Sequence, residues 1–311
     1  MTIHPQCQVI LDAAAAGVSM FDAPNIAEVR RRYAAATDIY APTVIAVKSS
    51  EDRTIPGPSG DISIRIYTPE DVAGPLPVLM FFHGGGWVVG DLDSHDAVCR
   101  ILCNSAKCLV IATDYRMGPE HRFPAAFEDA WAALNWAQEN ARNIGGDPSR
   151  IAIGGDSAGG NLSAGVALYA RDNHGPSLNL QLLIYPAVDM TATGGSRITH
   201  GEDRILTTGA IDWFEARYLS GEDDRTDPRA SPLLAADHSN LPPAFILTAE
   251  YDPLIDEGKA YADKLNAAGS VAEYKCYPGM VHGFARMGVL VDMSVEALSD
   301  SAAALRAAFN A

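Results

Sequence analysis

The chain has 311 residues, of which 48% are hydrophobic and 20% are charged. This balance is typical of a folded globular protein and excludes an intrinsically disordered chain. The formal net charge of −16 argues against a nucleic acid or an anionic membrane surface as the partner, because binding to either depends on clustered lysine and arginine. No uninterrupted apolar run is long enough for a transmembrane helix, so no membrane span is expected.

The five cysteines form no C-x-x-C pair. An odd number without such pairs disfavours both a disulfide framework and a structural zinc site, so no metal is expected. Cys99 and Cys103 have helical spacing without a nearby histidine, which predicts two buried, small apolar side chains. Reduced thiols, and a beginning that lacks the basic residues of a signal peptide, favour a cytoplasmic protein.

Residues 1–45 are rich in alanine and helical in pattern, and a series of predicted strands follows. Apolar and polar residues alternate over 62–66, as in a half-buried strand. Residues 77–82 form a continuous apolar run, which is typical of a strand buried on both faces. Further strands are predicted at 108–112, 151–153, 180–185, 244–247 and 271–277.

Helical patterns lie between these strands, at 125–143, 158–172, 254–268 and 294–309. Strands that alternate with helices predict an α/β fold, with a mostly parallel central sheet and helices on both faces. Residues 188–240 interrupt the alternation with only a helical patch at 211–219, and long insertions of this kind are commonly lids. We expect 1–45 and 188–240 to form a cap over a core made of 46–187 and 241–311.

The sequence Gly155-Asp156-Ser157-Ala158-Gly159 fits the pattern G-x-S-x-G between a predicted strand and a predicted helix. This is the context of a nucleophile elbow, in which glycines are needed because side chains would clash in the sharp turn. Ser157 is therefore the candidate nucleophile. The alternative is an ordinary glycine-rich turn with Ser157 as the helix N-cap.

A second glycine-rich segment, His83-Gly84-Gly85-Gly86, directly follows the buried strand at 77–82. Acyl transfer needs backbone N–H groups that converge on a developing oxyanion, and glycines let the backbone approach closely. One such N–H is expected from this loop and one from Ala158, the residue after the nucleophile. His83 is expected to hold the loop by hydrogen bonds.

The chain order predicts an acid and a base for the nucleophile. In hydrolases with a nucleophile elbow the order is serine, then aspartate or glutamate, then histidine. Asp252 and His282 each follow one of the last two predicted strands, so both belong at the edge of the sheet where open α/β folds bind ligands. Glu250, nearer its strand, and Asp256, in the following helix, are the alternatives for the acid.

Taken together, these segments resemble the bacterial hormone-sensitive-lipase-like (family IV) esterases of the α/β-hydrolase superfamily. The resemblance rests on HGGGWVVGDLDSHD at 83–96, DYRMGPEHRFPAAFED at 114–129, GGDSAGGNL at 154–162, YDPLIDE at 251–257 and YPGMVHGF at 277–284. Met117-Gly118 departs from the Leu-Ala that is more frequent in the family. No catalytic role attaches to that pair.

The resemblance implies an α/β-hydrolase fold with a helical cap, a triad of Ser157, Asp252 and His282, and no cofactor. The oxyanion amides would come from Gly84, Gly85 and Ala158. The expected activity is hydrolysis of short- to medium-chain acyl esters through an acyl-enzyme. Dimers are frequent in the family, which leaves a homodimer open. Aromatic residues near strand ends and in the cap are candidates for the substrate pocket: Trp87, Tyr185, Trp213 and Phe214.

Two other functions are open at this stage. A lactonase or an amidase would use the same triad, so the sequence does not separate them from an ester hydrolase. A non-catalytic receptor for a small ligand is the second alternative, because plant gibberellin receptors resemble this family but lack the catalytic histidine. His282 stands in an intact YPGMVHGF segment, which favours an enzyme.

Overall fold

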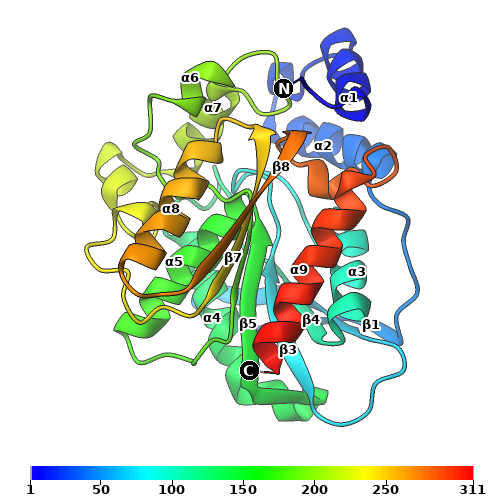
Figure 1. The fold of residues 1–311 in the computed structure, drawn as a ribbon, viewed down its shortest axis with the longest axis vertical. Helices are drawn as coiled ribbons and strands as arrows, with labels where there is room; N and C mark the ends of the chain where they lie inside the picture. Colours follow the sequence, from blue (N-terminus) through cyan, green and yellow to red (C-terminus); the bar gives the residue numbers. More distant parts are fainter. Residues whose placement is uncertain (1, 311) are drawn as a thin grey trace.

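The computed structural model describes residues 2–310 and is built around one sheet. Within these residues the sheet has eight strands in the order β1-β2-β4-β3-β5-β6-β7-β8 (Figure 1). β2 pairs antiparallel with both β1 and β4, and every pairing from β4–β3 through to β7–β8 is parallel. This confirms the predicted mostly parallel sheet. The strands are β1 (Ser49–Gly57), β2 (Gly60–Thr68), β3 (Leu76–Phe82), β4 (Leu109–Asp114), β5 (Gly146–Asp156), β6 (Gln181–Ile184), β7 (Ala244–Tyr251) and β8 (Ala272–Val281).

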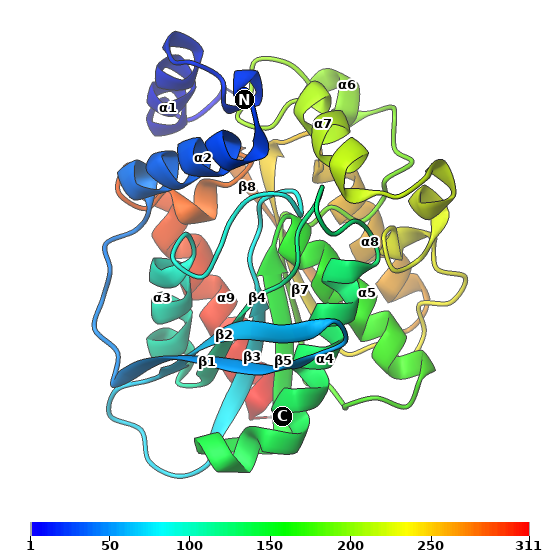
Figure 2. The ribbon, with the colours of Figure 1, turned by 180° about the vertical axis from the view of Figure 1, so that it is seen from behind.

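Helices cover both faces of the sheet, as predicted (Figures 1 and 2). The α-helices are α1 (Pro5–Ala16), α2 (Ile26–Tyr40), α3 (Asp96–Ala106), α4 (Ala125–Asn140), α5 (Ala158–Asp172), α6 (Ser196–Thr199), α7 (Thr208–Tyr218), α8 (Ile255–Ala267) and α9 (Met293–Phe309). Short 3₁₀ turns are η1 (Met20–Asp22), η2 (Ala141–Ile144), η3 (Glu222–Thr226), η4 (Pro232–Leu234) and η5 (Phe284–Arg286). Cys99 and Cys103 are buried in α3, as their spacing predicted.

The strand β3 shows why the sheet is buried on both sides. All seven of its residues are buried, and successive side chains point to opposite faces. Val78 and Phe82 pack in the cluster that contains residues of α4 and α5. Leu79 and Phe81 pack in the cluster that contains residues of α3 and α9. A continuous apolar run is therefore the pattern that this position in the sheet requires.

The elements α1, α2, α6 and α7 gather at the end of the sheet where the parallel strands point (Figures 1 and 2). Arg30 fixes α2 there, because its Nε donates to the carbonyl of Val88 at 2.9 Å and its Nη2 to that of Gly118 at 3.0 Å. Arg197 of α6 forms a buried ion pair of 2.9 Å with Glu257 of α8. Two segments far apart in the sequence, the N-terminal helices and α6–α7, thus meet over the carboxyl ends of the strands.

Within residues 2–310, no helix combines the length and the apolar character that a bilayer crossing requires.

Candidate active site

The turn from β5 to α5 is a strained one with Ser157 at its tip. Ser157 has φ 54° and ψ −116°, a backbone conformation that L-residues rarely adopt, and its side chain makes no capping hydrogen bond. A Cβ on Gly155 would lie 2.2 Å from the carbonyl oxygen of Phe82, and one on Gly159 would lie 1.8 Å from the same atom. Both glycines are therefore sterically required. The geometry is that of a nucleophile elbow and disfavours the alternative of a serine N-cap.

Three side chains from three different strand ends form a hydrogen-bonded chain. Ser157 Oγ lies 3.0 Å from His282 Nε2, and His282 Nδ1 lies 2.7 Å from Asp252 Oδ2. Asp252 is fully buried, and its other oxygen accepts the backbone N–H of Leu254 at 2.8 Å. A carboxylate held on both oxygens orients the imidazole, which in turn can accept the serine proton.

The two alternative acids make other contacts. Glu250 Oε2 accepts the backbone N–H of Gly279 at 2.7 Å, in the segment that leads to His282. Asp256 Oδ2 accepts the backbone N–H of Ser196 at 2.8 Å, at the start of α6. Asp252 is thus the acid that contacts the imidazole.

The glycine-rich loop after β3 requires one correction of the predicted oxyanion donors. The backbone N–H of Gly84 donates to Asp156 Oδ1 at 2.8 Å, so this amide is engaged and is removed from the set. Gly85 and Gly86 line the cavity beside Ser157. The amide of Ala158 opens α5, where the first N–H groups of a helix have no partner within it. The donors that the geometry offers are therefore Gly85, Gly86 and Ala158.

His83 stabilises this loop, as predicted. Its Nδ1 lies 2.8 Å from the carbonyl oxygen of Gly84, and its ring stacks on Tyr115 with centroids 4.3 Å apart. The Tyr115 hydroxyl donates to the carbonyl oxygen of His83 at 2.7 Å. Burial, together with the neighbouring His95, lowers the pKa of His83 to about 4. The ring is therefore neutral at physiological pH and serves the loop as a hydrogen-bonding group.

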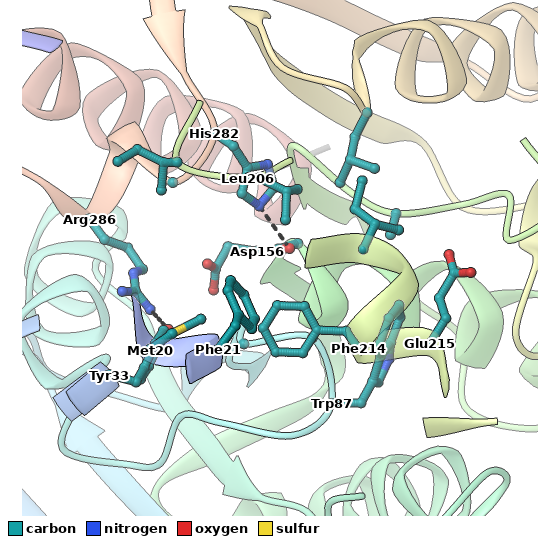
Figure 3. A pocket seen from close by; sticks show the side chains of 18 of the residues that line it. Met20, Phe21, Tyr33, Trp87, Asp156, Leu206, Phe214, Glu215, His282 and Arg286 are labelled. Carbon is teal, nitrogen blue, oxygen red and sulfur yellow. Dashed lines mark hydrogen bonds between the residues drawn. The ribbon is translucent and has the colours of Figure 1, made fainter. Parts of the chain in front are cut away.

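A cavity of about 140 Å³ lies beside Ser157 and His282 (Figure 3). Trp87 and Phe214, two of the four candidates for the substrate pocket, are among its lining residues. The other two candidates, Tyr185 and Trp213, are not among its lining residues. Tyr185 packs against the His282 ring at 4.8 Å between centroids. Trp213 lies beside Phe214 at 5.3 Å.

Several lining residues were not among the candidates predicted from the sequence. Tyr33 and Phe21 line the cavity, and both had only loose aromatic contexts in the N-terminal segment. Arg286 and Met287 line it from the turn after His282, where no pattern marked them. Figure 3 shows Arg286 and Tyr33 at one end of the cavity, the rings of Phe21 and Phe214 between, and the Glu215 carboxylate beyond Phe214.

Comparison with known proteins agrees with this geometry. A family model described as alpha/beta hydrolase fold matches residues 79–286. The chain is 48% identical to the carboxylic ester hydrolase LipN of Mycobacterium tuberculosis, over 82% of this chain and 69% of that protein. It is 42% identical to the carboxylesterase NlhH of the same species, over 99% of this chain and 97% of that protein.

Two solved structures have the same fold over essentially the whole chain. An ester-hydrolase from the metagenome of Lake Arreo, complexed with a derivative of bipyridine phosphonate, is 39% identical with a TM-score of 0.96 and covers 100% of both chains. The hyperthermophilic esterase from the archaeon Pyrobaculum calidifontis is 40% identical with a TM-score of 0.93 and covers 99% of both. The sheet, the elbow and these likenesses together show that the chain belongs to the α/β-hydrolase family, in its bacterial hormone-sensitive-lipase-like (family IV) branch.

Proposed function

We propose that this protein is a serine carboxylesterase, which hydrolyses carboxylic esters through an acyl-enzyme on Ser157. The observation that carries the proposal is the hydrogen-bonded chain from Ser157 through His282 to Asp252. Relatives named as carboxylic ester hydrolase and carboxylesterase, at 48% and 42% identity, support it. An intact base in contact with the nucleophile also opposes a receptor function, which would leave this geometry without a use.

The proposed reaction follows from the positions of these groups. Ser157 Oγ attacks the ester carbonyl carbon while His282 Nε2 takes the serine proton, and the amides of Gly85, Gly86 and Ala158 stabilise the oxyanion. His282 then gives the proton to the leaving alcohol as the acyl-enzyme forms. Water attacks the acyl-enzyme by the same route, which releases the acid and restores Ser157. Asp252 fixes the imidazole tautomer throughout.

The size of the cavity supports esters of short to medium acyl chains. A dry cavity of roughly 150 Å³ binds a molecule the size of benzene, and the cavity beside Ser157 measures about 140 Å³. Phe214 is one wall of this cavity and packs closely on Gly86, since a Cβ on Gly86 would lie 2.3 Å from its ring. The chemistry of the triad is shared with lactonases and amidases, so these substrates belong in the same assay.

The proposal extends to the architecture around the site. Residues 1–45 and 188–240 would act as the cap, with 46–187 and 241–311 as the catalytic core. Support comes from cavity residues that lie in these segments, such as Phe21 and Phe214. Five free cysteines are consistent with a cytoplasmic protein. A homodimer is proposed from the family resemblance.

The direct test is hydrolysis of p-nitrophenyl esters from acetate to palmitate by the wild type and by Ser157→Ala. We expect cleavage that peaks at short or medium chains and a loss of about a million-fold in kcat in the variant. Ser149→Ala is the matched control, because Ser149 lies on the same strand, β5, near its opposite end. Near-wild-type turnover by folded Ser157→Ala, or no cleavage of any ester, lactone or amide by the wild type, would overturn the proposal.

A further inference from the structure

A buried polar cluster lies directly behind the proposed oxyanion loop. Asp156, the residue before the nucleophile, accepts the Gly84 N–H on Oδ1, and the same oxygen lies 3.0 Å from His95 Nε2. Asp156 is 4% exposed and His95 is 1% exposed. Although burial opposes it, His95, Arg286 and the Gly84 amide hold the pKa of Asp156 below its usual range, so the carboxylate stays ionised.

The cluster continues from His95 to the N-terminal helix α2 through Arg286. Arg286 Nη1 lies 3.0 Å from His95 Nε2 and also donates to the hydroxyl of Tyr33. Its Nη2 lies 3.4 Å from Thr37 Oγ1, one turn further along α2. Figure 3 shows the Arg286 side chain extended towards Tyr33 at one end of the cavity. One guanidinium thus connects the turn after His282 with the helix that lies over it.

Both ring nitrogens of His95 have polar neighbours. Ser94 Oγ, which donates to the carbonyl oxygen of Asp91, lies 3.0 Å from His95 Nδ1. His95 Nε2 lies 3.0 Å from Asp156 Oδ1 and 3.0 Å from Arg286 Nη1, so the imidazole stands between the carboxylate and the guanidinium. Burial and the Arg286 cation lower the pKa of His95, which favours the neutral imidazole.

Arg286 is the cation that faces Asp156 through this histidine. In residues 2–310, no carboxylate lies within ion-pair distance of the Arg286 guanidinium, and the Asp156 carboxylate contacts the His95 imidazole instead. The positive charge of Arg286 therefore compensates the buried carboxylate across one imidazole. A buried carboxylate that loses the cation facing it moves or takes up a proton, because burying an uncompensated charge is costly.

We propose that Arg286 is a positioning residue for ester hydrolysis. It holds the oxyanion loop in place through His95 and Asp156, and it makes the geometry of that loop depend on the position of α2. Gly84 precedes the two amides that face Ser157, so a shift of Asp156 moves Gly85 and Gly86. The inference rests on the proposed function. Because displacements of about 1 Å cost on the order of 10²-fold in rate, the effect should be visible in kcat.

The test compares Arg286→Met with the wild type on a short p-nitrophenyl ester. We expect kcat to fall on the order of 10²-fold with little change in KM, since the oxyanion forms only in the transition state. An alkyl trifluoromethyl ketone, which adds Ser157 to form an oxyanion, should lose affinity in parallel. Arg150→Met is the matched control: Arg150 donates to Asp147 and to the carbonyl oxygen of Pro75, at the opposite end of β5.

Tyr33→Phe keeps the inference testable if Arg286→Met does not fold, because it removes only the hydroxyl that accepts from Arg286. We expect a smaller fall in kcat, and no further fall when the change is added to a folded Arg286→Met. The inference is overturned if folded Arg286→Met keeps its kcat or shows only a rise in KM. If Arg286→Met is unfolded, an unchanged kcat in Tyr33→Phe overturns it. Absence of esterase activity in the wild type would instead overturn the proposed function.

Discussion

Glu250 Oε2 lies 2.7 Å from the backbone nitrogen of Gly279 and accepts its hydrogen bond. Glu250 is two positions from Asp252 in the sequence, yet its carboxylate serves the backbone before His282, whereas Asp252 serves the imidazole itself. Neighbouring carboxylates at the end of β7 thus have different tasks. One shapes the segment that carries the base, and the other orients the base.

This division predicts unequal effects of two isosteric substitutions. Asp252→Asn should lower kcat by roughly 10⁴-fold, because an amide can hold the imidazole in the wrong tautomer. Glu250→Gln keeps an oxygen that can accept the Gly279 N–H, so its effect on kcat should be far smaller. Steady-state hydrolysis of p-nitrophenyl butyrate measures both. A greater loss in Glu250→Gln would mean that the acid has been misassigned.

Phe214→Ala should move the preferred acyl length towards longer chains. Phe214 is 7% exposed, lines the cavity and packs over Gly86. Truncation removes the wall that limits the cavity, and it also exposes the oxyanion loop to a wider opening. The ratio of kcat/KM for a decanoate ester to that for the acetate, measured in the same preparation, reports the change independently of protein quality. An unchanged ratio would show that another residue limits chain length.

Asp114→Asn should stabilise the protein at pH 8 but not at pH 4. Asp114 ends β4, and burial together with Asp91 and Asp93 raises its pKa to about 6. A carboxyl whose pKa is raised on folding favours the folded state below its unfolded pKa, and this contribution is lost as the pH rises through the folded value. After allowance for the partial exposure of Asp114, the free energy of unfolding of Asp114→Asn at pH 8 should exceed that of the wild type by about 1 kcal/mol. Equal gains in Tm at both pH values would exclude this origin.

Arg197→Met should destabilise the protein by about 3–5 kcal/mol, because it leaves a buried charge without its partner. Arg197 is 5% exposed and lies 2.9 Å from Glu257 and 3.9 Å from Glu215. Arg217→Met is the control on α7: its guanidinium lies 3.6 Å from the centroid of the Trp213 ring, a contact worth roughly 0.5–1 kcal/mol when exposed. Urea unfolding measures both. Similar small losses in the two variants would mean that Glu257 becomes neutral or solvated at little cost.

Much of the fold could be predicted because its signals are local. The apolar run of β3 and the G-x-S-x-G pattern around Ser157 can each be read within one short stretch of sequence. The strand β1 was missed because it carries no such local signal. It lies at the edge of the sheet with Ile55 as its one buried hydrophobic residue, so no alternation marks it. The order of Ser157, Asp252 and His282 along the chain was enough to predict that they meet.

The sequence by itself therefore determined the α/β class, the elbow, and Ser157 and His282 as candidate nucleophile and base, whereas Glu250 and Asp256 stayed open beside Asp252 as the acid until the family resemblance favoured Asp252. Only the tertiary structure decided that Gly84 donates to Asp156, that Tyr185 and Trp213 stay outside the cavity, and that Arg286 meets Tyr33, 253 positions away in the chain. The physical reason is that a motif constrains the backbone of its own segment. Which amide remains free, or which ring faces a cavity, depends on side chains that arrive from distant segments and compete for the same hydrogen bonds and space.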